Sequence, residues 1–173
     1  LNQEYLTYIK KVIKKAVKTG TDEIFFDNFF LRSAPKDCRS PLVLSEFKDY
    51  LKIKYPTKEK VFRRFGYTTV DFLELPVWDV FNSPSDLTAI DDPVLQEWID
   101  FRCKILADYG KFLYDYAKSL NPDIAVGLNI KGLLGRNRAW FDGIYHPFYQ
   151  GICDFYTPDA GIKAQLLDNG ALV

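Results

Sequence analysis

The sequence is poor in histidine, cysteine and methionine. It contains one histidine, three cysteines and no methionine among 173 residues. Cys38, Cys103 and Cys153 are odd in number and lack the paired spacing of a zinc motif or a disulfide framework. We therefore expect no metal and no cofactor. Cys38 in particular should bind no metal, because one thiolate does not complete a tetrahedral site.

The chain also lacks a long apolar run and an excess of charge of either sign. No stretch approaches the roughly 18 apolar residues of a membrane span, and no signal peptide is visible, which leaves the localisation unknown. Lysine plus arginine equal aspartate plus glutamate, at 23 each. This balance argues against a nucleic acid or a membrane surface as partner and favours a neutral substrate. It leaves the oligomeric state open, a homo-oligomer included.

What is present suffices for one folded domain over residues 1–173. Hydrophobic residues make up 47% of the chain and aromatic residues 16%, enough to bury a substantial core. Because the chain begins at Leu1 inside a helical pattern, we expect it to be a fragment of a longer protein. Apolar spacing and end signals predict helices over Asn2–Lys18, from Pro41 to the stop at Pro56, over Lys58–Phe65, and from Pro93 to the close at Asn121.

Three short apolar runs separate these helical segments and read as buried strands. They cover Asp22–Phe30, Asp123–Ile130 and Gly151–Tyr156, and none is followed by a hairpin turn. Strands that alternate with helices form parallel sheets with right-handed crossovers. The predicted fold class is therefore α/β, and specifically part of a (β/α)8 TIM barrel, in which the three strands are adjacent and long helices connect them.

An ordered series of residues between Glu23 and Tyr156 carries a family resemblance. It comprises Asp27 and Asn28 at a strand end, Cys38, Phe47, Tyr50, Leu51, Tyr55, Phe65, Gly66, the long helix from Pro93, and Asn129 at the next strand end. In this order and spacing the chain resembles glycoside hydrolase family 42 and the glycosyl hydrolases related to it, a β-galactosidase-like group. The resemblance implies a barrel of eight strand-helix units acting on a glycosidic bond, with the visible strands as the fourth, fifth and sixth.

The chain departs from that family at two places. The family's fourth strand ends in Asp-Asn-Glu, with Glu as the general acid/base, whereas Phe29 stands at the third position here. The family also tends to carry a zinc-holding cysteine cluster in the next loop, but Cys38 is followed by Ser40 and Val43. The family's nucleophile lies on the seventh strand, which would fall beyond Val173.

Glycoside hydrolysis needs two carboxylates on opposite sides of the scissile bond. Asp27 is the first candidate, because the carboxyl ends of barrel strands carry the active site. The run FFDN that contains it is also similar to the strand end of α-galactosidase and α-fucosidase barrels, where the Asp is the nucleophile. Asp154 and Asp159 are candidates for the second carboxylate, and the apolar neighbours of Asp154 predict a raised pKa. For each, a capping role in a loop is the alternative.

Polar and aromatic residues near the same strand ends are candidates for binding a carbohydrate substrate. Aromatic faces pack on the apolar side of a sugar ring, and amides and cations bond its hydroxyls. The candidates are Asn28, Arg32, Trp78, Asn129, Lys131 and Tyr156, with Trp140 and Tyr145 as further sugar platforms. Trp98 instead has the helical spacing of a core residue. A barrel that binds carbohydrate without catalysis is the alternative function, because Phe29 replaces the family's acid. A purely structural interaction module is a third.

Overall fold

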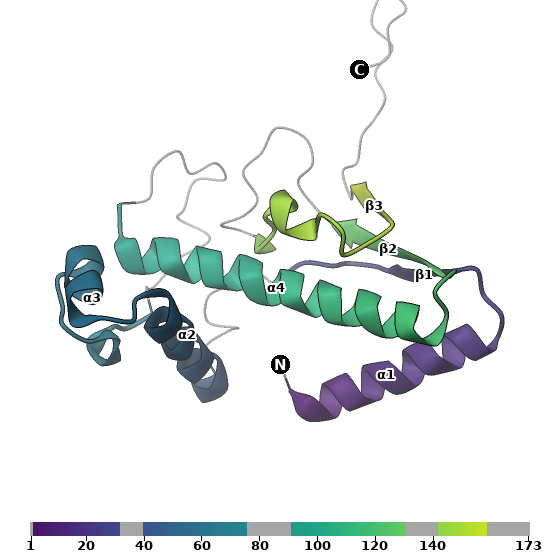
Figure 1. Cartoon of the computed structure of the whole chain (residues 1–173), viewed down its shortest axis with the longest axis horizontal. Coiled ribbons are helices and arrows are strands. Elements are labelled where there is room, and N and C mark those ends of the chain that lie inside the picture. The colour runs from purple at the N-terminus through teal and green to yellow at the C-terminus, as the bar shows by residue number, and fades with distance from the viewer. Residues whose placement is uncertain (1, 32–39, 76–90, 131–141, 159–173) are drawn as a thin grey trace, which may run out of the picture.

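The computed structural model describes residues 2–31, 40–75, 91–130 and 142–158 (Figure 1). The elements follow in the order α1 (Gln3–Lys18), β1 (Glu23–Phe26), α2 (Pro41–Lys54), α3 (Lys58–Phe65), η2 (Val70–Phe72), α4 (Pro93–Leu120), β2 (Ala125–Ile130), η3 (His146–Tyr149) and β3 (Phe155–Pro158). Helix α4 runs the length of the molecule in Figure 1, with the sheet on one side of it and α1 on the other.

Helix boundaries agree with the predicted ones because local side chains set them. The Asp92 carboxylate accepts hydrogen bonds from the N–H groups of Val94 and Leu95, and Pro93 occupies the first turn of α4. Gly66 ends α3 in the left-handed conformation, at φ 77°. In the described part of the chain, no helix combines the length and apolar character needed to cross a membrane.

The three strands form one parallel sheet in the order β1-β2-β3, as the sequence predicted. Phe26 is in register with Leu128, and Asn129 is in register with Thr157. The predicted third strand was misplaced, because β3 begins at Phe155. The preceding apolar residues form a turn in which Gly151 has φ 74° and Ile152 packs into the core. Their apolar character reflects that burial and not pairing in the sheet.

The helix side of the sheet holds the first core. Val126, Leu128 and Ile130 are fully buried and pack with residues of α4 such as Leu113 and Ala117. Because side chains alternate along a strand, the residues between them face the other way. There the Phe25 and Phe155 rings lie parallel at 6.1 Å on either side of Gly127. Phe25 is 41% exposed, so described residues leave this second face partly open.

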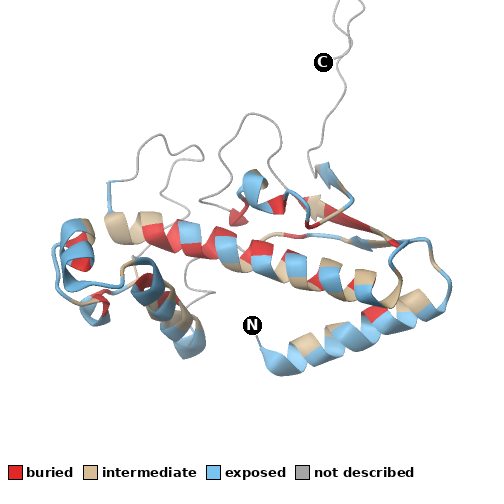
Figure 2. Ribbon diagram, in the orientation of Figure 1, coloured by how far each residue is buried: buried red, intermediate tan, exposed pale blue. Residues whose placement is uncertain are grey.

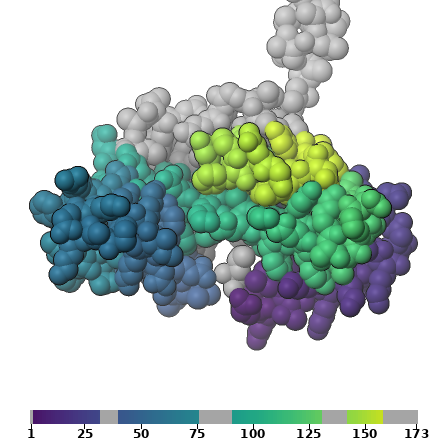
Figure 3. Space-filling view, in the orientation of Figure 1, coloured from purple at the N-terminus to yellow at the C-terminus, as the bar shows by residue number. Residues whose placement is uncertain are grey.

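A second core joins α2, α3 and η2 to the first half of α4. Leu51 and Phe47 of α2 meet Trp98 of α4, which is 1% exposed, and this confirms Trp98 as a core residue. Buried residues appear along most of α4 in Figure 2, and this one helix contributes to both cores. In Figure 3, α2 and α3 lie at one end of the molecule and α1 at the other. The α2–α3 unit therefore packs on the N-terminal half of α4, whereas β2 follows the C-terminal end of that helix.

Candidate functional site

Asp27 stands at the carboxyl end of β1 and is the centre of a small polar cluster. Its Oδ1 accepts hydrogen bonds from the backbone N–H of Asn28 at 2.8 Å and from Nδ2 of Asn129 at 2.5 Å. Its Oδ2 accepts one from Nδ2 of Asn28 at 3.0 Å. The side chain is nevertheless exposed. The structure thus brings together three of the predicted site residues, with the carboxylate as the common acceptor.

Register explains why Asn129 reaches Asp27 from a strand far away in the sequence. Phe26 pairs with Leu128, so the next residue of each strand shares one level of the sheet. Thr157 of β3 is in register with Asn129 and adds a hydroxyl to the same row. Sequence reasoning did not single out Thr157, because the strand was placed too early in the chain. A correct register would have found it.

Phe29, which follows Asn28 at the end of β1, points into the core. It is 5% exposed, and its ring stacks on Tyr109 at 5.8 Å and meets Tyr149 edge-on at 6.2 Å. Gly110 of α4 leaves room for the ring, since a Cβ there would lie 3.3 Å from Cζ of Phe29. This position is therefore part of the packing against α4, and its side chain contributes nothing to the polar cluster.

The predicted pairing of Asp154 with Asp27 is wrong. Asp154 directly precedes β3, and its Oδ2 accepts hydrogen bonds from the Val126 N–H at 2.8 Å and forms an ion pair with Lys118 at 2.8 Å. Val126 lies near the start of β2, so Asp154 sits at the amino end of the sheet, opposite Asp27. The predicted rise in pKa is wrong too. Burial alone would raise the pKa of Asp154, but Lys118 and the Val126 N–H hold it below the ordinary value.

Two of the remaining predicted residues, Tyr156 and Tyr145, belong to the described part of the chain and have other neighbours than Asp27. Tyr156 is in register with Leu128, whose side chain lies in the helix-side core, and its ring stacks on His146 at 6.5 Å. Tyr145 meets Phe148 edge-on at 4.9 Å. The other candidates lie outside the described residues, namely Arg32, Trp78, Lys131, Trp140, Asp159 and the cysteine Cys38.

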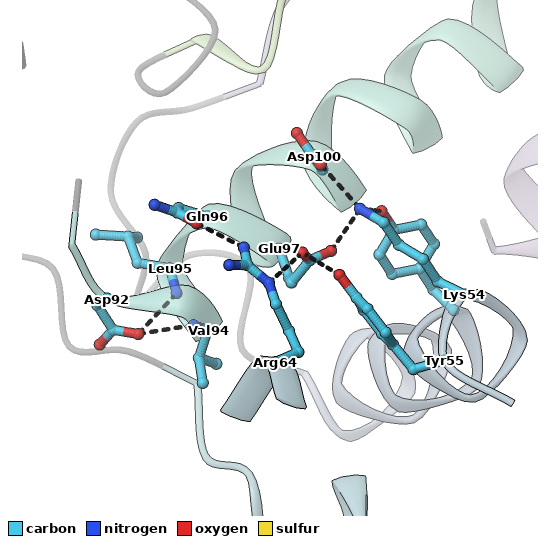
Figure 4. Close-up of polar contacts among 10 residues, drawn as sticks. Lys54, Tyr55, Arg64, Asp92, Val94, Leu95, Gln96, Glu97 and Asp100 are labelled. Atoms are coloured by element: carbon cyan, nitrogen blue, oxygen red, sulfur yellow. Dashed lines mark hydrogen bonds and ion pairs between the residues drawn. The ribbon is translucent and has the colours of Figure 1, made fainter. Parts of the chain in front are cut away.

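A second polar cluster surrounds Glu97 of α4 (Figure 4). The side chain is 3% exposed and accepts hydrogen bonds from Lys54 and Tyr55 at 2.6 Å each and from Arg64 at 3.0 Å. Burial acts to raise the pKa of Glu97, but these donors outweigh it and the pKa lies below its usual value. For Lys54, burial acts to lower the pKa, yet its bonds to Glu97, Tyr50 and Asp100 raise it. Every group is paired, so the cluster joins α2 and α3 to α4.

Residues able to hold a metal ion do not gather in the described part of the chain. No group of three or more histidine, cysteine, aspartate and glutamate side chains is placed there for coordination. Cys103 is buried and Cys153 is half-buried. Burial raises the pKa of Cys103 to about 12, which disfavours the thiolate that metal binding and nucleophilic attack require. The exposed polar cluster at Asp27 offers the chemistry of a carboxylate and two side-chain amides.

The fold and the site define an α/β protein with a parallel sheet and a carboxylate at the carboxyl end of a strand. No protein-family model matches the chain, and no curated protein matches it in sequence. Among solved structures it is similar to the β-galactosidase of the psychrophilic Marinomonas ef1, with a TM-score of 0.62 and 16% sequence identity. The match covers 92% of this chain and 24% of that enzyme, so the chain spans about a quarter of the enzyme's length. This likeness shows a shared fold.

Proposed function

We propose that this chain forms part of a glycoside hydrolase that cleaves O-glycosidic bonds of a neutral oligo- or polysaccharide. One observation carries the proposal. An exposed carboxylate, Asp27, is held by three donors at the carboxyl end of a parallel strand, which is where α/β barrels place their catalytic groups. The zero net charge of the chain supports a neutral substrate. The similar fold of a β-galactosidase supports the same class of reaction.

The three strands belong, in this proposal, to a closed (β/α)8 barrel. Helices cover one face of the sheet, while Phe25 and Phe155 are stacked on the other. A barrel fills its interior with such inward-facing side chains from successive strands. The coverage of only 24% of the similar enzyme is consistent with a chain that supplies a few of the barrel's strands.

Asp27 suits the role of nucleophile or base better than that of acid. Asp27 is the acceptor in all three of its hydrogen bonds, two of them at Oδ1 and one at Oδ2. Oδ2 receives only one of the three and is the oxygen with capacity left for a reacting centre. A second carboxyl group must then protonate the leaving oxygen. Asp159, which follows β3, remains the candidate within this chain.

A carbohydrate-binding barrel without catalysis is the second candidate function. The observation that favours it is the burial of Phe29 against α4, which leaves the position of the family's acid/base without an acid. Asp27, Asn28 and Asn129 would then act only as hydrogen-bonding partners of sugar hydroxyls. This alternative retains the site and the ligand class and gives up only the bond cleavage.

Two measurements on the full-length protein separate the two functions. A panel of aryl glycosides tests for cleavage, and isothermal titration with the corresponding free sugars tests for binding. We expect cleavage of at least one aryl glycoside. Binding of a sugar without cleavage of any glycoside would support the binding barrel, and neither binding nor cleavage would reject both functions.

A further inference from the structure

The backbone at Asn28 is held in a conformation that other residues avoid. Its φ is 53°, and it is the only non-glycine residue with positive φ among the residues that the structure describes. Asparagine tolerates this left-handed region better than most residues. Such strain persists where the surroundings fix it, and it is concentrated at functional sites.

Contacts on both sides of Asn28 fix this conformation. The N–H of Phe29 donates to the carbonyl oxygen of Asn129 at 2.9 Å, and the N–H of Phe30 donates to that of Asn28 at 2.9 Å. The buried Phe29 ring anchors the chain against Tyr109. The left-handed turn is therefore held between strand β1 on one side and the buried Phe29 ring on the other.

The result of this conformation is that one residue bonds both oxygens of Asp27. The Asn28 N–H donates to Oδ1 at 2.8 Å and its Nδ2 donates to Oδ2 at 3.0 Å. Nδ2 of Asn129 adds a third bond from β2. A carboxylate bonded on both oxygens from one side has little freedom to rotate, which preorganises it for reaction.

From this geometry we infer that Asn28 is a positioning residue that fixes the Asp27 carboxylate. The side-chain amide of Asn28 donates a hydrogen bond to Asp27. The left-handed turn that ends β1 therefore also fixes the geometry of the site. The inference rests on the proposed function, because it assigns Asn28 a part in placing the reacting oxygen.

The test compares Asn28→Gly with Asn28→Ala in the full-length protein. Glycine keeps the left-handed backbone accessible and removes only the side-chain donor, whereas alanine removes the donor and strains the turn. We expect Asn28→Gly to lower kcat by about 10- to 100-fold with KM almost unchanged, because misplacing a reacting group by about 1 Å costs on the order of 100-fold. Asn28→Ala should lose at least as much.

Three other outcomes overturn the inference. A raised KM with normal kcat in Asn28→Gly would make Asn28 a substrate ligand. Normal kcat and KM in that variant would reduce it to a turn residue. A crystal structure of Asn28→Gly adds a readout independent of activity, in which Asp27 should occupy more than one rotamer, and a single unchanged rotamer contradicts the inference. Asp27→Asn serves as reference, because full turnover in it rejects the proposed role of Asp27 itself.

Discussion

At the scale of the residue, Asp27 combines exposure with fixed geometry. Carboxylates on protein surfaces usually sample several rotamers. The Asp27 carboxylate instead accepts three hydrogen bonds, two from Asn28 at the end of β1 and one from Asn129 of β2. An exposed and immobilised acceptor is what a nucleophile or base requires. Glu97 shows the opposite combination, since it is buried and fully surrounded by its partners. In the proposed function, this difference in accessibility separates the reactive carboxylate of Asp27 from the structural one of Glu97.

We predict that Glu97→Gln destabilises the protein without changing the Asp27 site. The substitution leaves Lys54 and Arg64 without their shared charged partner. Because these two cations are 35% and 30% exposed, we expect a loss of about 1–3 kcal/mol, less than for a fully buried pair. Chemical denaturation at neutral pH measures the change. The matched control is Asp100→Asn, whose carboxylate also contacts Lys54 but is 61% exposed, and an exposed pair contributes less than about 1 kcal/mol.

We also predict that the loss of stability caused by Glu97→Gln depends on pH. Because the pKa of Glu97 is lower in the folded state than its ordinary value, its contribution to stability is complete above the ordinary glutamate pKa of about 4.3. The contribution is lost as the pH falls from there through the folded-state pKa. The stability difference between wild type and Glu97→Gln should therefore shrink in acid. A difference that stays constant between neutral pH and pH of about 3 would contradict this assignment.

At the scale of the element, the sequence correctly predicted those boundaries that local interactions determine. Helix ends followed from caps such as Asp92 and Gly66, which act within a few residues of themselves. Strand ends depend on a partner that is distant in sequence. Asp154 was placed within a strand because its neighbours are apolar, yet its position is set by Val126 and Lys118. Asp27 was placed correctly because an abrupt polar residue after an apolar run is a local signal.

We predict that Asp154→Asn lowers stability and leaves turnover unchanged. The variant loses the charge that pairs with Lys118 while β2 and β3 still meet, and we expect a loss of about 1 kcal/mol because the pair is partly exposed to solvent. Thermal melting and the glycosidase assay on the full-length protein measure the two effects. Asp115→Asn, which alters an exposed pair within α4, should change less. A large fall in turnover would return Asp154 to the catalytic candidates.

The sheet itself gives a prediction at Gly127. A Cβ at this position would overlap the Phe155 ring and lie 2.8 Å from that of Phe25. Gly127→Ala should therefore push the rings apart and destabilise the fold by about 1–3 kcal/mol, as overpacking does. Denaturant melting checks the size of the effect. Unchanged stability would show that the two rings do not pack over Gly127.

At the scale of the whole molecule, α4 connects two cores that serve different ends. Its second half covers the sheet on which Asp27 stands, and its first half holds the α2–α3 unit. Glycoside hydrolysis needs a second carboxylate that faces Asp27. Among the described residues, neither core supplies one at such a position. The similar β-galactosidase is about four times longer than the matched region. The full-length protein is therefore the right material for every functional test.

The most direct test of the central claim is turnover by the full-length protein carrying Asp27→Asn. The substitution preserves the shape of the side chain, so the fold should persist and the thermal melting temperature should change little. We expect turnover to fall by about 10²- to 10⁴-fold, as when a positioned acid or base is lost. Asp22→Asn, the same change at the other end of the same strand, is the matched control and should retain wild-type turnover. Near-normal turnover in Asp27→Asn would show that Asp27 is structural and that the catalytic groups lie elsewhere.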